Sequence, residues 1–338
     1  MKIFMPDMHL DFSYSIAKTL EILGYDLYVP DQTFNRYIRY GLKFLKDGYD
    51  ANTAYYDFPA LRNRAVEFTS LKNVKVVSYE ELLSEQIDVY ISPCSQQDVD
   101  MYNLFHTHKP RCPRLRLCNW SGNNSDIHKY QFGKMQNIFT GDIGNYNIAK
   151  SSGKNCLYFF PFIDYSRYSH SEHNSIFIRN YIIKQSQYWK EGWEISNVIK
   201  NAMSNAGMND YVEFDLEPDW RKPPNDNIAE LMKDSMATIH IKAKEGFGYA
   251  ICHSLASGRP LIMYNKYKSN KTYNNWCIDN ETSIFFDKYE DLFIKLTRYI
   301  FDIDLRKTMQ ENASKKIREL INNTEQAEAM GKFLQELR

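Results

Sequence analysis

Short apolar runs alternate with amphipathic stretches along the first half of the chain. The run Lys2–Met5 predicts a strand, and Ser13–Leu23 predicts a helix because Ile16, Leu20 and Leu23 fall on one helical face. Further strands are predicted at Asp26–Val29, Val74–Val77, Ile87–Ile91, Arg114–Cys118, Asn137–Thr140 and Cys156–Phe160. Helical stretches lie between several of these strands. This alternation predicts a mostly parallel, doubly wound α/β sheet.

The segment Pro161–Ser175 is polar and lacks helical periodicity, which is typical of a linker. Beyond it the alternation restarts. Strands are predicted at 175–179, 211–214, 237–241, 260–264 and 283–286, and helices at 188–205, 249–257, 289–303, 305–322, from 228 onward and in the C-terminal tail. Because 338 residues is long for one hydrophobic core, we expect two Rossmann-like domains facing each other across a cleft. Their expected ranges are residues 1–165 and residues 172–338, and the C-terminal helices are counted in the second domain.

The amino-acid composition bears on which kinds of partner the protein could bind. Lys and Arg together number 42 and so do Asp and Glu, so no overall charge points to nucleic acid or to a membrane. Tyr (25 residues) and Phe (20 residues) are abundant. Aromatic surface suits the stacking of sugars or bases, although an A/T-biased genome would enrich tyrosine without any function.

The sequence contains no pattern typical of a membrane-spanning segment or of a metal site. No stretch approaches the roughly 20 apolar residues that span a bilayer. The six cysteines are scattered and include no C-x-x-C pair, which argues against a zinc site or a disulfide framework. We therefore expect a cytoplasmic protein. The basic run His108–Arg116 is compatible with a solvated face and with a peripheral contact to a membrane or an anionic acceptor.

The stretch from Lys244 to Pro260, KEGFGYAICHSLASGRP, contains three of the chain's 14 glycines. It follows a predicted strand and opens a predicted helix, where open α/β sheets bind ligands. Gly246 and Gly248 allow close approach of the backbone, and a helix N-terminus offers N–H groups to a phosphate. Glu245 beside this end could accept hydrogen bonds from hydroxyl groups. An ordinary turn with Glu245 as a solvated cap is the alternative, and no G-x-G-x-x-G dinucleotide fingerprint is present.

The longer pattern resembles the C-terminal signature of family 4 retaining GT-B glycosyltransferases, roughly E-G-F-G-x4-E-A-x-A-x-G-x-P. The matching positions are Glu245, Gly246, Phe247, Gly248, Ala256, Gly258 and Pro260, and Ser254 replaces a small alanine. The resemblance is specific between Glu230 and Pro260 and architectural elsewhere.

The resemblance implies roles for the matched residues. Glu245 would contact hydroxyl groups of the donor sugar, while Gly246, Phe247 and Gly248 would line the donor. The family's second acid, which binds the nucleotide ribose, falls on His253. A neutral imidazole can hydrogen-bond a ribose hydroxyl; a helix residue packed under the loop is the alternative.

Such enzymes neutralise the departing diphosphate with an arginine and a lysine rather than a metal. In this sequence the resemblance assigns that role to Arg179, with Lys190 and Lys184 as competing candidates for the lysine. No metal and no cofactor are expected beyond the nucleotide-diphosphate sugar itself.

The N-terminal domain is expected to bind the acceptor, a glycan, a lipid-linked compound or another hydroxyl compound. The family's usual Gly-Gly loop after the first strand is replaced by Pro6–Ser15, which brings Asp7 and His9 toward the cleft. The histidine often found after the fourth strand is also missing.

These features predict a metal-independent, retaining glycosyltransferase. Two alternatives stay open: a nucleotide-sugar epimerase with the GT-B fold, and a non-catalytic GT-B subunit that binds a partner.

Overall fold

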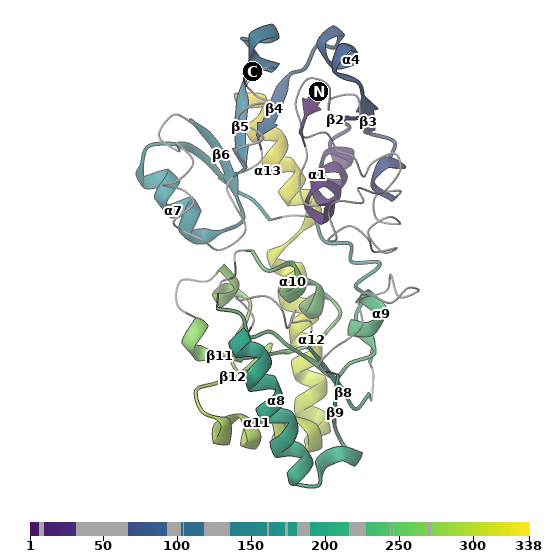
Figure 1. Ribbon diagram of the computed structural model, residues 1–338, viewed down its shortest axis with the longest axis vertical. Helices are drawn as coiled ribbons and strands as arrows, with labels where there is room; N and C mark the ends of the chain where they lie inside the picture. The colour runs from purple at the N-terminus through teal and green to yellow at the C-terminus, as the bar shows by residue number, and fades with distance from the viewer. Residues whose placement is uncertain are drawn as a thin grey trace. The chain divides into compact units, whose positions relative to one another are not determined.

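The apolar runs of the sequence form two separate parallel sheets in the computed structural model of the chain (Figure 1). The structure describes residues 1–6, 10–31, 67–92, 103, 105–117, 136–160, 162–172, 175–180, 190–215, 228–243, 245, 247–268 and 272–338. One compact unit combines Met1–Phe162 with Asn322–Arg338, and the other contains the described residues between Ile163 and Ile321.

The first unit contains a seven-stranded sheet in the order β3-β2-β1-β4-β5-β6-β7, with all paired strands parallel. Its strands are β1 (Lys2–Phe4), β2 (Asp26–Pro30), β3 (Val74–Val77), β4 (Val89–Ser92), β5 (Arg114–Leu117), β6 (Asn137–Thr140) and β7 (Asn155–Tyr158). The helices whose full bounds lie within the described residues include α1 (Leu10–Ile22), α4 (Tyr79–Ser84), α7 (Ile143–Ser151) and α13 (Asn323–Glu336). The strand order reverses between β1 and β4, so connections run to both sides of β1.

Alternating side chains cover both faces of this sheet. Ile3 belongs to the core cluster that also includes residues of α1 and α13. Phe4 points to the opposite face, where its ring lies 5.3 Å from that of Tyr90 and 5.5 Å from that of Phe105. Both faces are apolar because buried parallel strands are covered on two sides.

The C-terminal helix α13 completes the core of the first unit. Met330, Phe333 and Leu334 lie in the same cluster as α1, and Figure 1 shows the yellow helix α13 beside the purple helix α1. The sequence-based boundaries counted this helix with the second domain, which differs from the packing observed. Its apolar stripe is visible in the sequence, but a stripe does not specify which core it covers.

The second unit contains a five-stranded parallel sheet in the order β12-β11-β10-β8-β9. Its strands are β8 (Phe177–Asn180), β9 (Glu213–Asp215), β10 (Ala237–Ile239), β11 (Leu261–Tyr264) and β12 (Ser283–Phe286). Its α-helices are α8 (Lys190–Asn205), α9 (Ile228–Lys233), α10 (Tyr249–Ala256), α11 (Tyr289–Phe301) and α12 (Ile303–Leu320), and its 3-10 helices are η4 (Met208–Asp210), η5 (Asn265–Tyr267) and η6 (Thr272–Asn275).

The strand order of the second sheet reverses between β8 and β10, which pair directly with Asn180 opposite Ile239. The buried amide of Asn180 donates to Ser196 Oγ of α8 at 3.1 Å. On the opposite face, Thr238 Oγ1 lies 2.6 Å from Ser254 Oγ of α10. Helices therefore cover both faces, and the carboxyl ends of β8 and β10 form a topological switch point, where such sheets bind ligands.

The segment after the first unit is fastened to the second unit before β8 begins. Tyr165 Oη donates to Ile317 O at 3.1 Å and to Ile321 O at 2.7 Å, at the end of α12. The guanidinium of Arg318 lies 4.3 Å from the centre of the Tyr165 ring. These contacts hold the start of the second unit against its last helix.

Arg259, in the core of the second unit, makes hydrogen bonds to the same segment before β8. The residue is fully buried, and its Nη2 donates to Ser171 O at 2.8 Å and to Lys233 O at 2.7 Å. Its Nε donates to Met232 O at 3.2 Å, and its Nη1 donates to Gly258 O at 3.0 Å. A buried guanidinium is tolerated when its donors are satisfied in this way.

Within the described part of the chain, no helix combines the length and the apolar composition needed to cross a bilayer.

Candidate functional site

The loop between β10 and α10 lies at the switch point of the second sheet and contains Glu245. This residue is 6% exposed. Its carboxylate lies close to two nitrogen groups: Nε2 of His240, which directly follows β10, is 2.8 Å from Oε2, and Nζ of Lys242 in the loop is 3.2 Å from Oε1. A buried acid, a histidine and a lysine thus meet beside the strand ends.

The environment of Glu245 keeps it ionised. Burial alone would raise the pKa of the carboxyl, but the hydrogen bond with His240 and the charge of Lys242 outweigh burial and lower the pKa to about 2. An ionised carboxylate only accepts hydrogen bonds, so Nε2 of His240 carries the proton in this pair. A carboxylate can accept about four hydrogen bonds, and the contacts with His240 and Lys242 use two of them.

Two residues at the start of α10 have different structural roles: Gly248 through its backbone conformation and Phe247 through the packing of its side chain. Gly248 is the N-cap residue with a φ of 84°, and a Cβ there would lie 2.9 Å from Ile251 Cδ1. The position therefore requires glycine. Phe247, whose backbone N–H is expected to lie near the donor, has a fully buried side chain, with its ring 5.6 Å from that of Trp276 and 5.4 Å from that of Tyr249. These contacts assign Phe247 to the core beneath the loop.

His253, the expected ribose contact, lies in the last turn of α10 and is half-buried. Its ring stacks on that of Tyr168 with centroids 3.9 Å apart and planes 5° apart. Tyr249 approaches the same imidazole at 5.8 Å. One face of the ring is therefore covered by the chain itself, as the packing alternative requires.

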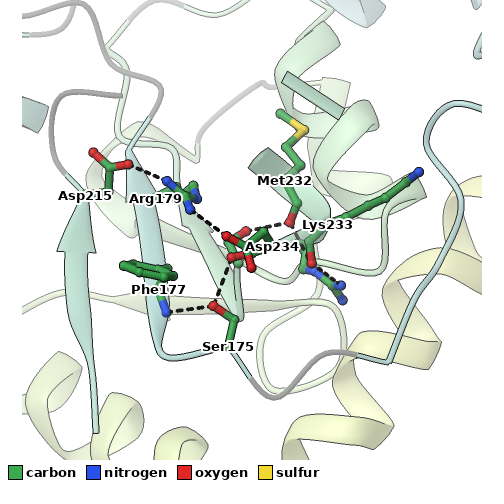
Figure 2. A network of polar contacts seen from close by, with 9 residues as sticks. Ser175, Phe177, Arg179, Asp215, Met232, Lys233 and Asp234 are labelled. Atoms are coloured by element: carbon green, nitrogen blue, oxygen red, sulfur yellow. Dashed lines mark hydrogen bonds and ion pairs between the residues drawn. The ribbon is translucent and has the colours of Figure 1, made fainter. Parts of the chain in front are cut away.

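Arg179, the expected partner of the diphosphate, belongs to a cluster of ion pairs (Figure 2). Its guanidinium pairs with Asp215 through Nη1 and with Asp234 through Nη2 at 2.9 Å, and only 9% of its side chain is exposed. The guanidinium also lies 4.8 Å from the centre of the Phe177 ring. Two carboxylates already compensate this charge, so these contacts do not support a role in binding a leaving phosphate.

Lys190 begins α8, and its side chain is 76% exposed. Its ammonium is 3.9 Å from Glu194 on the next turn, a loose surface pair. The predicted residues Asp7, His9, Lys184 and Gly246 lie outside the described residues.

His240 and Lys242 are not among the site residues predicted from the sequence. The strand predicted at 237–241 contains His240, whereas β10 ends at Ile239; a polar residue near the carboxyl end of an apolar run is the available signal, because side chains there line the ligand-binding edge of a parallel sheet. Across the described ranges, no three His, Cys, Asp or Glu side chains gather closely enough to hold a metal ion.

Comparison with protein-family models gives no match, and neither does comparison with curated protein sequences. Solved structures do match. HepE of Anabaena, crystallised with UDP and glucose, has a TM-score of 0.66 and 10% identity over 99% of this chain and 100% of its own. Sucrose-phosphate synthase of Thermosynechococcus elongatus has a TM-score of 0.64 and 10% identity over 100% and 99%.

A glycosyltransferase of Rickettsia africae matches with a TM-score of 0.61 and 13% identity over 99% of this chain and 98% of its own. Likeness at such low identity concerns the fold alone. The predicted fold class is confirmed: the chain has the α/β fold called GT-B, with two Rossmann-like, doubly wound domains.

Proposed function

We propose that this protein is a retaining, metal-independent glycosyltransferase that moves a sugar from a nucleotide-diphosphate sugar to an acceptor hydroxyl. The observation that carries the proposal is the buried, ionised Glu245 at the switch point of the second sheet, next to the start of α10. The acceptor is a glycan, a lipid-linked compound or another hydroxyl compound.

The chemistry follows from how charge moves during transfer. The bond between the anomeric carbon and the diphosphate breaks through an oxocarbenium-like state, and negative charge collects on the leaving phosphate. The N-terminus of α10 carries partial positive charge, and Lys190 begins α8 with its ammonium in solvent, so both can stabilise that charge. The leaving phosphate takes the acceptor proton on the same face, which gives retention without a second catalytic carboxylate.

A screen of nucleotide sugars by thermal unfolding tests this proposal. Since HepE was crystallised with UDP and glucose, uridine donors come first in the panel. A donor at about 100 times its Kd should stabilise the protein by about 2.7 kcal/mol, and the same donor should be hydrolysed slowly without acceptor. A panel in which nothing stabilises the protein and nothing is hydrolysed would overturn the proposal.

A non-catalytic GT-B subunit is the second candidate, favoured by the stacking of His253 on Tyr168 and by the ion-paired Arg179. Stabilisation by a donor without any turnover would select this candidate. Formation of an altered free nucleotide sugar without acceptor would instead identify an epimerase.

Chelation should leave activity largely intact. The proposed neutralisation of the diphosphate uses a helix N-terminus and lysine side chains, so no divalent ion is needed. Turnover of the donor identified above should be equal in EDTA and in Mg²⁺ or Mn²⁺. Loss of turnover in EDTA that a divalent ion restores would contradict metal independence.

His253→Ala should raise the KM for the donor about two- to tenfold and leave kcat close to that of the wild type. The nucleoside is chemically unchanged during transfer, so one lost hydrogen bond to it, about 0.5–1.5 kcal/mol, weakens binding alone. His253→Glu, which introduces the acid of the resembled signature, should retain donor binding. The exposed His106→Ala serves as the control with unchanged KM. An unchanged KM together with lower thermal stability would assign His253 to packing against Tyr168.

A further inference from the structure

His240 is a buried histidine to which the proposed mechanism assigns no role. It follows β10 directly and is 5% exposed. Its backbone is held by the central part of the sheet, because its N–H donates to Ile262 O of β11 at 3.0 Å. Its ring nitrogen Nε2 lies 2.8 Å from Glu245 Oε2. The histidine therefore links a rigid strand end to a loop carboxylate.

Glu245 depends on such a link for its position. It lies between β10 and α10, outside both regular elements, so no helix or strand pattern fixes its backbone. Lys242 contacts the other carboxylate oxygen, but it belongs to the same loop and its side chain is more exposed than that of His240. The contact from His240 thus relates the carboxylate directly to the end of a strand.

The remaining titratable groups around the carboxylate cannot replace this contact. Cys252 of α10 and Tyr273 of η6 both feel the charge of Glu245. Burial, together with that charge, raises the pKa of the Cys252 thiol and of the Tyr273 hydroxyl, so both stay neutral. His240 and Lys242, by contrast, both lower the pKa of Glu245 through their contacts with its carboxylate.

We infer that His240 is a positioning residue for sugar transfer: its Nε2–H holds the Glu245 carboxylate in the orientation that accepts hydrogen bonds from hydroxyl groups of the donor sugar. This inference rests on the proposed function. His240 itself does not touch the donor, and it acts through the orientation and the ionisation of Glu245.

Three variants test the inference. His240→Leu removes the N–H donor and keeps the bulk, whereas His240→Gln keeps an N–H donor. Thr238→Val is the matched control, because it removes a buried hydrogen bond from the same strand, the 2.6 Å contact with Ser254, without touching Glu245. For each variant, kcat and donor KM are measured from pH 4 to pH 9, and stability is measured by urea unfolding.

His240→Leu should lower kcat about ten- to a hundredfold, because misplacement of a catalytic group acts on the chemical step. Without the imidazole, Lys242 still opposes the effect of burial, but the pKa of Glu245 should rise above its wild-type value, so an acidic limb should appear in kcat at the acid end of the pH range. Activity is then lost as the pH falls through that limb. The wild-type protein should lack the limb, since its Glu245 is ionised above about pH 2.

His240→Gln should restore most of kcat and remove the acidic limb, while Thr238→Val should lose stability and keep the wild-type profile. Equal kcat and equal pH profiles for His240→Leu and the wild-type protein would overturn this inference and leave the proposed function standing. If the leucine variant does not fold, His240→Asn takes its place, because its shorter amide draws the N–H donor away from Glu245. His240→Asn should show the same acidic limb in kcat. A profile without that limb would overturn the inference. Inactivity of the wild-type protein toward every donor overturns the proposed function, and the inference with it.

Discussion

Glu245→Gln is expected to lower kcat by about a hundredfold or more, equivalent to roughly 3 kcal/mol of transition-state stabilisation, while the donor KM changes little. The amide keeps the shape of the side chain and removes its negative charge. The donor sugar gains positive charge as the diphosphate leaves, so a contact with an ionised carboxylate strengthens in the transition state. Glu245→Ala should show the same direction of change with a larger loss.

Glu191→Gln is the matched control for this substitution. Glu191 is also a glutamate of the second unit with two side-chain partners, since it pairs with Lys266 Nζ at 2.7 Å and accepts from the hydroxyl of Tyr267. It lies in the first turn of α8 and is partly exposed. The control should keep the wild-type kcat. A Glu245→Gln protein with unchanged kcat would show that the carboxylate does not contact the reacting sugar.

Gly258→Ala is expected to destabilise the protein by about 2–5 kcal/mol. The residue has a φ of 72°, a left-handed conformation that costs a residue with a Cβ about 1–2 kcal/mol. A Cβ there would also lie 2.0 Å from His170 Nδ1 and 3.1 Å from Gln310 O. The imidazole or the backbone must therefore move, and this adds the cost of overpacking a buried site.

Gly207→Ala separates the two contributions. Gly207 has nearly the same φ, 73°, but a Cβ there meets nothing within 4 Å. It should lose about 1–2 kcal/mol, from the backbone alone. In Gly258→Ala, the further substitution His170→Ala should recover part of the loss. Equal losses in the free energy of unfolding for Gly258→Ala and Gly207→Ala, measured with urea, would mean that the clash with His170 does not contribute to the destabilisation.

The elements of the fold could be predicted well from the sequence. The strands expected at Val74–Val77, Asn137–Thr140 and Ser283–Phe286 have those bounds in the structure. Buried parallel strands are continuous apolar runs, so their positions are a local property of the sequence. The assignment of α13 is not local, because an amphipathic helix fits any core that leaves an apolar groove uncovered.

The site could be predicted in part. The acid and the glycines around Glu245 form a short sequence pattern, and the structure adds that Gly248 has a left-handed conformation. The partners of Arg179 could not be predicted, because Asp215 and Asp234 reach it from other parts of the unit. His240 and Glu245 are five residues apart, a spacing that brings no side chains together in a helix or a strand. Only the path of the loop makes them neighbours.

The position of α13 has a consequence for how the chain acquires its structure during synthesis. The ribosome releases β1 before the second unit and Leu334 after it, yet both belong to one hydrophobic cluster. The second unit, with Ile321 at its end, can complete its own core earlier. Domains usually fold in the order in which they are made, N-terminal first. Here the position of α13 conflicts with that order, because the apolar surface that α13 covers in the first unit stays uncovered until the helix has been synthesised, after the second unit.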